Sequence, residues 1–367
     1  MSANKTKWVR LGEYIEEIDE RNSDLAITLS QGIANTKVFQ EPKQVSINSK
    51  ADKIVRTGYF AYNRATTRNG EKISIAYRVG PDCTVSSAYC VFRVKDENII
   101  NPYFLWLYFS RSEFDRYARY ASKGSAHEFF GWDEMCRVQI PLPSISIQRE
   151  LVNTYNGLKS LAEDNEALIA PLTQACEALV VDCKRKYDEV ALGEYIEEVD
   201  KRNSNLLVTL SQGIANTKVF QEPKQVSVNS KADKIVRTGH FAYNRATTRN
   251  GEKISIAYRI GPDCTVSSAY CVFRVKAENI VNPYFLWLYF LRSEFDRYAR
   301  YVSKGSAHEF FDWDEMCRVK IPLPPPDVQQ SIVNLYHCIE EAKRIAAEAR
   351  EQMRTLCPAL IQKAIHS

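Results

Sequence analysis

The chain has 367 residues, of which 45% are hydrophobic and 26% are charged, a composition typical of a globular protein with two or three domains. No apolar run approaches the roughly 18 residues that a membrane-spanning helix needs, and residues 1–8 hold no apolar stretch of signal-peptide length. We therefore expect a cytoplasmic protein. The net charge of +4 is compatible with a polyanionic partner but does not by itself indicate one.

The first predicted elements are a short strand at residues 25–28, a turn at residues 30–32 and a polar loop at residues 33–39. The strongest local pattern follows, because residues 58–67 and 72–78 are both rich in aromatic and β-branched side chains. Asn69 and Gly70 lie between these runs and form a dipeptide that fits a tight hairpin turn, since both residues tolerate positive φ. The sequence therefore predicts a β-hairpin here.

Polar and basic side chains gather around this predicted hairpin. Arg and Asn can each form two hydrogen bonds to the edge of one base. Thr can contact bases or phosphates, and Tyr can stack on a base or form a hydrogen bond to a phosphate. A solvated hairpin tip is the alternative, because such tips are polar in any protein. The candidate nucleic-acid contacts in this stretch are Tyr62, Asn63, Arg64, Thr66, Thr67, Arg68, Asn69 and Lys72.

Residues 84–94 predict a strand pair or one long strand. Asn101 and Pro102 then fit a helix start, with Asn as the cap and Pro at the first position, and residues 103–109 supply a buried face. The second half of this helix is basic through Arg111, Arg116 and Arg119, which can touch phosphates or simply face solvent.

A loop at residues 122–127 contributes further candidates, Lys123, Ser125 and His127, which combine donors with small hydroxyl groups. Residues 135–140 are expected to form a strand that leads into Pro-Leu-Pro.

Residues 144–188 and 325–367 differ strongly in sequence but share a heptad pattern of apolar positions. Each segment predicts a helix of about 38 residues, or roughly 57 Å at 1.5 Å per residue. Two such helices can pair antiparallel as a spacer, whereas the alternative is that each packs only on its own domain. Pro171 and Pro358 are expected to kink or restart these helices.

The predicted elements of residues 9–143 occur twice, because residues 190–324 repeat them at an offset of 181 with 15 differences in 135 positions. The predicted domains are 1–143 and 189–324, two globular α/β domains, each followed by a helical segment, 144–188 and 325–367. The fold class is thus α+β, with an approximate two-fold axis relating the copies. The second copy repeats the candidate contacts as Tyr243, Asn244, Arg245, Thr247, Thr248, Arg249, Asn250, Lys253, Lys304, Ser306 and His308.

Several catalytic patterns are missing from the sequence. Residues 101–104, Asn-Pro-Tyr-Phe, lack the second proline of the amino-methyltransferase loop, and no glycine-rich turn for S-adenosylmethionine occurs. There is no Gly-x4-Gly-Lys-Ser/Thr phosphate loop, and the histidines form no nucleophile–base pairing. The sequence therefore favours a binding protein without catalytic residues over an enzyme.

The cysteines form no Cys-x-x-Cys motif. Cys83, Cys90 and Cys136 recur in the second copy, and with His127 a zinc site is conceivable in each domain. Buried free thiols in strands explain the same residues, so we predict no metal site.

The layout resembles the specificity subunit of type I restriction-modification systems. Ile-Pro-Leu-Pro-x4-Gln-x3-Val leads into a helix at residues 140–152 and again at residues 321–333. Residues 58–63, Thr67, Arg68 and residues 85–92 are similar to the target recognition domain of that family. The chain departs from the family pattern in one respect, because its two recognition domains are nearly the same.

This resemblance implies a non-catalytic subunit that binds double-stranded DNA through two domains, one on each half of a bipartite and palindromic site. It also implies two adenine-N6 methyltransferase subunits and restriction subunits as partners, which would carry S-adenosylmethionine, ATP and Mg²⁺. The specificity subunit of a type IIB system and a free-standing DNA-binding regulator remain as alternatives.

Overall fold

The computed structural model describes residues 7–42, 49–65, 72–124, 128–223, 230–246, 253–305 and 309–366, with side chains up to residue 354 in the last segment. The chain divides into two compact units, one made of Met1–Asp164 with Ile345–Ser367 and the other of Asn165–Arg344. Each unit therefore holds one copy of the repeat and part of each long helix. No helix among the described residues is long and apolar enough to cross a membrane.

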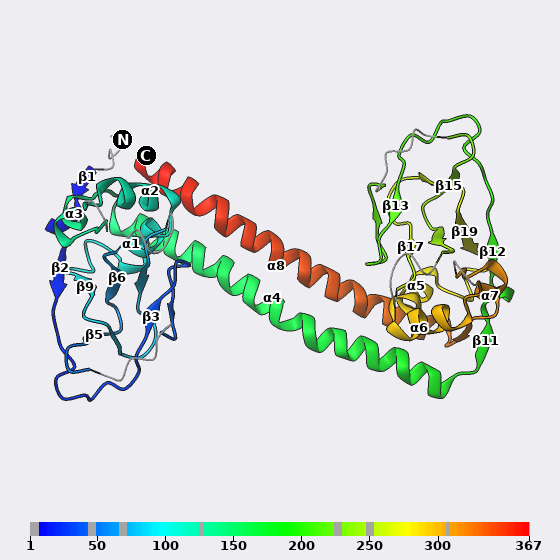
Figure 1. Cartoon of the computed structure of the whole chain (residues 1–367), viewed down its shortest axis with the longest axis horizontal. Helices are drawn as coiled ribbons and strands as arrows, with labels where there is room; N and C mark the ends of the chain where they lie inside the picture. The colour runs from blue at the N-terminus through cyan, green and yellow to red at the C-terminus, as the bar shows by residue number, and fades with distance from the viewer. Residues whose placement is uncertain are drawn as a thin grey trace. The chain divides into compact units, whose positions relative to one another are not determined.

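The first unit begins with a β-rich domain that also contains short helices (Figure 1). Its elements are β1 (Lys7–Arg10), the 3-10 helix η1 (Leu11–Glu13), β2 (Ile15–Ile18), β3 (Gly32–Ile33), β4 (Phe39–Gln40), β5 (Lys53–Val55), β6 (Phe60–Asn63), β7 (Ile75–Tyr77), β8 (Cys83–Val85), β9 (Tyr89–Val94), α1 (Pro102–Phe109), α2 (Ser112–Ala121), α3 (Trp132–Arg137) and β10 (Gln139–Leu142). The long helix α4 (Ile145–Lys186) follows.

The central sheet is antiparallel, with strand order β2-β9-β6-β7. Its register places Phe60 opposite Phe92, and their rings stack with centroids 4.9 Å apart. Phe109 from α1 lies edge-on against Phe60 at 5.8 Å. These aromatic contacts bury one face of the sheet under α1 and fix the strand that leads to the predicted hairpin tip.

Each domain is joined to the long helix that follows it by one buried glutamine. The Gln148 side chain donates to the carbonyls of Ile99 and Pro143, each at 2.9 Å, and accepts the Asn101 N–H at 2.8 Å. Gln329 repeats these three bonds in the second copy. The glutamine of the Ile-Pro-Leu-Pro-x4-Gln motif therefore satisfies three backbone groups at the start of each long helix.

The second unit repeats the same elements, as β11 (Glu189–Ala191), η2 (Leu192–Glu194), β12 (Ile196–Glu198), β13 (Gly213–Ile214), β14 (Phe220–Gln221), β15 (Lys234–Val236), β16 (Phe241–Asn244), β17 (Ile256–Tyr258), β18 (Cys264–Val266), β19 (Tyr270–Val275), α5 (Pro283–Leu291), α6 (Ser293–Val302), α7 (Trp313–Cys317) and β20 (Lys320–Pro322). The sheet order β12-β19-β16-β17 matches that of the first copy. The last helix is α8 (Pro326–His366).

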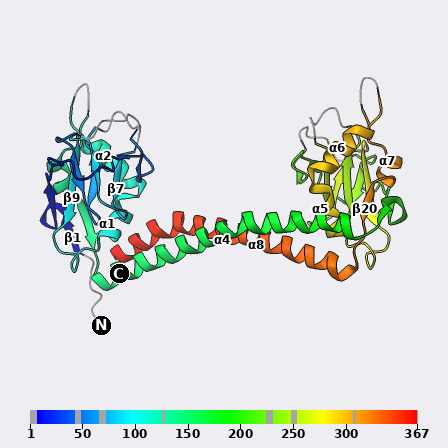
Figure 2. The ribbon, with the colours of Figure 1, turned by 90° about the horizontal axis from the view of Figure 1, so that it is seen from below.

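In the second unit, α4 and α8 lie side by side and run in opposite directions (Figures 1 and 2). Cys176, Val180 and Cys183 of α4 share a buried cluster with Ile332 and Ile339 of α8, and α5 completes it. In the first unit, Leu151 and Val152 of α4 pack against α1. Both long helices thus pack on the adjacent recognition domain, and within the second unit they also pack on each other.

These observations confirm a mixed α and β fold with two similar domains and long helices. Both long helices continue through Pro171 and Pro358, so the predicted restart does not occur. The heptad pattern of residues 144–188 predicts Leu179 as one of the buried apolar positions, but Leu179 is 44% exposed and Val180 is buried instead.

Two short predictions are also wrong. Residues 25–28 form no strand, because Leu25 has φ of +58° and the Asn22 side chain bonds both backbone groups of Ile27. Residues 135–137 belong to α3, and the predicted strand begins only at Gln139.

Candidate DNA interface

The structure brings the two predicted loops of the first domain together. Ala65, at the end of β6, forms a bridge with Phe129, and Phe129 forms a second bridge with Lys123. The Phe130 N–H donates to the Arg64 carbonyl at 2.8 Å. The same bridges join Ala246, Phe310 and Lys304 in the second copy. The segments around residues 64 and 123 therefore form one surface in each domain, although almost 60 residues separate them in the sequence.

We call this the hairpin surface and define it by its described candidate residues: Asn63, Arg64, Lys72 and Lys123 in the first domain and Asn244, Arg245, Lys253 and Lys304 in the second. The arginines and lysines are exposed and the two asparagines are half-buried. The other candidates, Thr66, Thr67, Arg68, Asn69, Ser125, His127, Thr247, Thr248, Arg249, Asn250, Ser306 and His308, lie outside the described residues.

Tyr62 and Tyr243 do not belong to this surface, and the prediction that they contact DNA is wrong. Both are fully buried, and the Tyr62 ring lies 6.1 Å from both Phe92 and Phe130, measured between centroids. Burial raises the pKa of Tyr62 far above its usual value. The sequence pattern of an aromatic residue in a strand that ends at a polar loop fits a contact residue and a core residue equally well. In this protein both tyrosines pack in the core.

Two polar contacts orient the strand end of the hairpin surface. The Asn63 side chain accepts the Ala65 N–H at 3.0 Å, which fixes the chain where β6 ends. The Arg64 Nε donates to the Ala88 carbonyl at 3.2 Å. This bond uses Nε alone, and among the described residues the two Nη groups have no acceptor, so they can serve an external one.

Lys123 is held by an acidic residue of α3. Its Nζ lies 2.6 Å from Glu134 Oε1, and Arg137 lies 3.6 Å from the same oxygen. The hydrogen bond from Lys123 lowers the pKa of the Glu134 carboxyl, so this carboxylate stays charged at neutral pH. Lys123 is therefore positioned by Glu134 while its side chain remains mostly exposed.

A buried ion pair that no sequence pattern indicated supports the other strand of the hairpin. Lys37 Nζ lies 2.8 Å from Asp115 Oδ1, donates to the Phe109 carbonyl at 2.5 Å and is almost fully buried. Asp115 also accepts the Ile73 N–H at 3.2 Å, directly after Lys72. Lys218 and Asp296 repeat the pair in the second copy. The pair thus ties the backbone beside Lys72 to α2.

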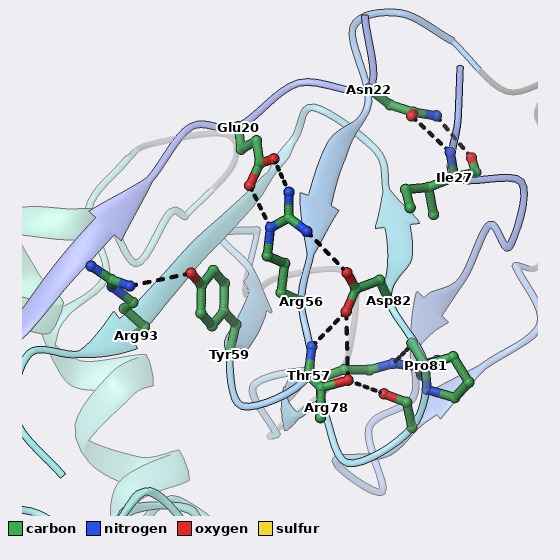
Figure 3. A network of polar contacts seen from close by, with 11 residues as sticks. Glu20, Asn22, Ile27, Arg56, Thr57, Tyr59, Arg78, Pro81, Asp82 and Arg93 are labelled. Atoms are coloured by element: carbon green, nitrogen blue, oxygen red, sulfur yellow. Dashed lines mark hydrogen bonds and ion pairs between the residues drawn. The ribbon is translucent and has the colours of Figure 1, made fainter. Parts of the chain in front are cut away.

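A second polar network lies at the other end of β6, around Arg56 (Figure 3). Arg56 donates to Glu20 Oε2 at 2.9 Å and to Asp82 Oδ2 at 3.2 Å, while Asp82 accepts the Thr57 N–H at 2.9 Å. The hydrogen bond to Glu20 raises the pKa of Arg56. This network differs between the copies, because Lys201 replaces Glu20 in the second domain.

The cysteines of the sheet strands lie in the core of the domain. Cys83 and Cys90 are buried, and the Cys90 thiol donates to Glu17 at 3.4 Å. Burial raises the pKa of Cys90 to about 12, so its thiol is protonated at neutral pH. Within the described part of the chain, no three His, Cys, Asp or Glu side chains gather as metal ligands.

Comparisons with known proteins bear on the identity of these domains. Residues 184–348 match the family model described as the type I restriction modification DNA specificity domain. None of the curated proteins compared with the chain matches it. The S subunit of a type I restriction-modification system from M. genitalium superposes with a TM-score of 0.57 at 11% identity, over 99% of this chain and 97% of that chain. This similarity shows a shared fold.

The HsdS subunit from Thermoanaerobacter tengcongensis superposes with a TM-score of 0.46 at 20% identity, over 100% of this chain and 97% of that chain. The family match covers the whole second copy of the repeat, residues 190–324. The first copy differs from it at only 15 of 135 positions, so it is a domain of the same kind. Residues 184–348 therefore belong to the type I restriction modification DNA specificity domain family, and residues 9–143 form a second, nearly identical copy of that domain.

Proposed function

We propose that the chain is the DNA specificity subunit of a type I restriction-modification complex, in which each recognition domain binds one half of a bipartite DNA site. The observation that carries this proposal is the duplicated domain of that family with its basic hairpin surface. Arg64, Lys72 and Lys123 are exposed in the first domain, and their counterparts are exposed in the second.

The proposed chemistry divides the contacts into two kinds. Arg64 and Arg245 can form two parallel bonds with the N7 and O6 acceptors of guanine, which distinguishes bases in the major groove. Lys72 and Lys123 suit phosphates, because an ammonium group is a point charge without a preferred plane. The candidates outside the described residues, among them Arg68 and Asn69, belong to the same proposed contact set.

The proposal includes partners that perform the chemistry. Two adenine-N6 methyltransferase subunits would bind this subunit and carry S-adenosylmethionine, and restriction subunits would bring ATP and Mg²⁺. The chain would supply recognition alone, and the two long helices would serve as a spacer between the recognition domains. These assignments follow from the family and from the duplicated layout of the chain.

Reconstitution tests this proposal. The full chain is co-expressed with the methyltransferase subunit of the same system, and adenine methylation of a plasmid is compared with that produced by either protein alone. We expect N6-methyladenine only when both proteins are present. Stable sequence-specific DNA binding by the chain alone, with no methylation in the mixture, would instead indicate a free-standing regulator.

A further inference from the structure

Across residues 62–72 and 122–131, the two copies differ at one position, where Gly131 of the first domain is replaced by Asp312. In the second domain, Arg245 Nη1 lies 3.7 Å from Asp312 Oδ1, and both side chains are about half exposed. Asp312 precedes α7 but its side chain makes no capping bond to that helix. Its carboxylate is therefore available to the arginine of the hairpin surface.

The equivalent arginine of the first domain has different neighbours. Arg64 Nε donates to the Ala88 carbonyl, and no described carboxylate lies within ion-pair distance of its guanidinium. Gly131 has no side chain to offer, whereas Arg245 makes no corresponding bond to Ala269 within the described parts of the chain. The same arginine is thus anchored by a backbone carbonyl in one copy and drawn to a carboxylate in the other.

We propose that Asp312 is a specificity-determining residue that makes the second recognition domain read its half-site differently from the first. This inference rests on the proposed function. Arg64 can present a free pair of donors to a guanine. Arg245 Nη1 is drawn toward Asp312, so a guanine bound by this arginine would lie close to a carboxylate that repels the acceptor atoms of the base and the phosphates.

The charge on the two surfaces supports the same asymmetry. Lys123 pairs with Glu134 in the first domain and Lys304 pairs with Glu315 in the second, and the second domain adds the described ion pair between Arg245 and Asp312. Each additional negative charge weakens attraction to the DNA backbone. This extra charge should weaken binding of the second domain to any sequence, whereas the attraction of Arg245 to Asp312 should lower the guanine preference at the position that the arginine contacts.

The test exchanges the two residues. Gly131→Asp is feasible, because Gly131 and Asp312 share nearly the same backbone angles, with φ of −78° and −80°. The added Cβ would meet only the end of the flexible Glu134 side chain, at 2.8 Å. Asp312→Gly gives the second domain the residue of the first, and Asp312→Asn removes the charge while keeping the size.

The full chain, assembled with its methyltransferase subunits, selects sites from a duplex library in which both half-sites are randomised. We expect the wild type to prefer guanine about tenfold to a hundredfold at one position of the first half-site, the size of one bidentate contact, and less in the second. Asp312→Gly and Asp312→Asn should make the guanine preferences of the two half-sites equal. Gly131→Asp should weaken the preference in the first.

Arg64→Ala and Arg245→Ala separate this inference from the proposed function. A relaxed base preference at one position of the first half-site in Arg64→Ala would show that the hairpin surface contacts DNA. If the two wild-type half-sites then have equal guanine preferences, and the exchanges at residues 131 and 312 leave those preferences unchanged, Asp312 has no role in specificity. If neither alanine variant changes the selected sequence, the hairpin surface itself is wrongly assigned and the inference is overturned with it.

Discussion

At the scale of single residues, the duplication provides internal controls, since most substitutions can be compared with the same position in the other copy. Tyr59 and His240 are such a pair. In the first domain, the Tyr59 hydroxyl accepts a hydrogen bond from Arg93 at 3.4 Å. In the second, His240 is half-buried between Arg274 and Arg237, and its Nδ1 has no partner among the described residues.

His240 should make stability depend on pH. Burial, with a smaller effect of Arg274 and Arg237, lowers the pKa of His240 below its usual value of 6.5. His240 therefore binds a proton more readily in the unfolded chain than in the folded chain. The free energy of unfolding should fall as the pH drops through 6.5, by at most about 1.4 kcal/mol per pH unit. Unfolding of the wild type and His240→Tyr at pH 7.5 and 5.5 measures this. An identical pH dependence of both proteins would refute it.

The Lys37–Asp115 pair should contribute strongly to the first unit. Lys37→Met leaves the buried Asp115 without its cation, and such a loss costs about 3–5 kcal/mol. Adding Asp115→Asn should recover most of the loss, because the amide oxygen still accepts the Ile73 N–H. Hydrogen exchange resolved along the chain measures the opening free energy of each unit, and the second unit is the internal control. A cost below about 1 kcal/mol for Lys37→Met would contradict this account.

At the scale of elements, the junction between each domain and its long helix depends on one glutamine. Gln148→Leu leaves three buried backbone groups of Ile99, Asn101 and Pro143 unpaired, at about 1–3 kcal/mol each. Gln329→Leu should have the same effect in the second copy. Gln330 is exposed, so Gln330→Leu is a matched control with a much smaller effect. Urea unfolding compares the variants. Equal midpoints for Gln329→Leu and Gln330→Leu would show that the buried glutamine does not stabilise the junction.

Elements with local signals could be predicted from the sequence. Asn101 caps α1 as expected, accepting the Tyr103 N–H at 2.9 Å, and β6 pairs with β7 as the predicted hairpin. The long helices follow from their heptads. The strand predicted at residues 25–28 failed because Asn22 imposes a loop on apolar residues.

The candidate site was predictable only in part, for a physical reason. The sequence suggested both loops of the hairpin surface, but their contact through Ala65 and Phe129 is long-range. The same holds for Lys37, which meets Asp115 far along the chain, and for Tyr62, whose burial is decided by Phe92 and Phe130. Hydrophobic patterns and secondary-structure propensities reflect interactions between residues close in sequence, whereas these contacts depend on tertiary packing.

At the scale of the whole molecule, the proposed spacer can be tested by its length. Deleting residues 158–164 removes one heptad, about 10 Å of helix or roughly three base pairs of DNA. We expect both half-sites to stay recognisable while their separation changes, which sequencing of methylated DNA measures. A companion variant that also lacks one heptad of α8 keeps the two helices matched in length. An unchanged separation in a folded deletion variant would show that the helices do not set it.

The central claim is that two nearly identical domains recognise two related half-sites, and sequencing of modified bases in genomic DNA from cells that carry this complex tests it most directly. The account predicts an interrupted site with N6-methyladenine once on each strand. Its two halves should be reverse complements, apart from a weaker preference where Arg245 replaces Arg64. Two unrelated half-sites, or methylation of one continuous sequence, would contradict it.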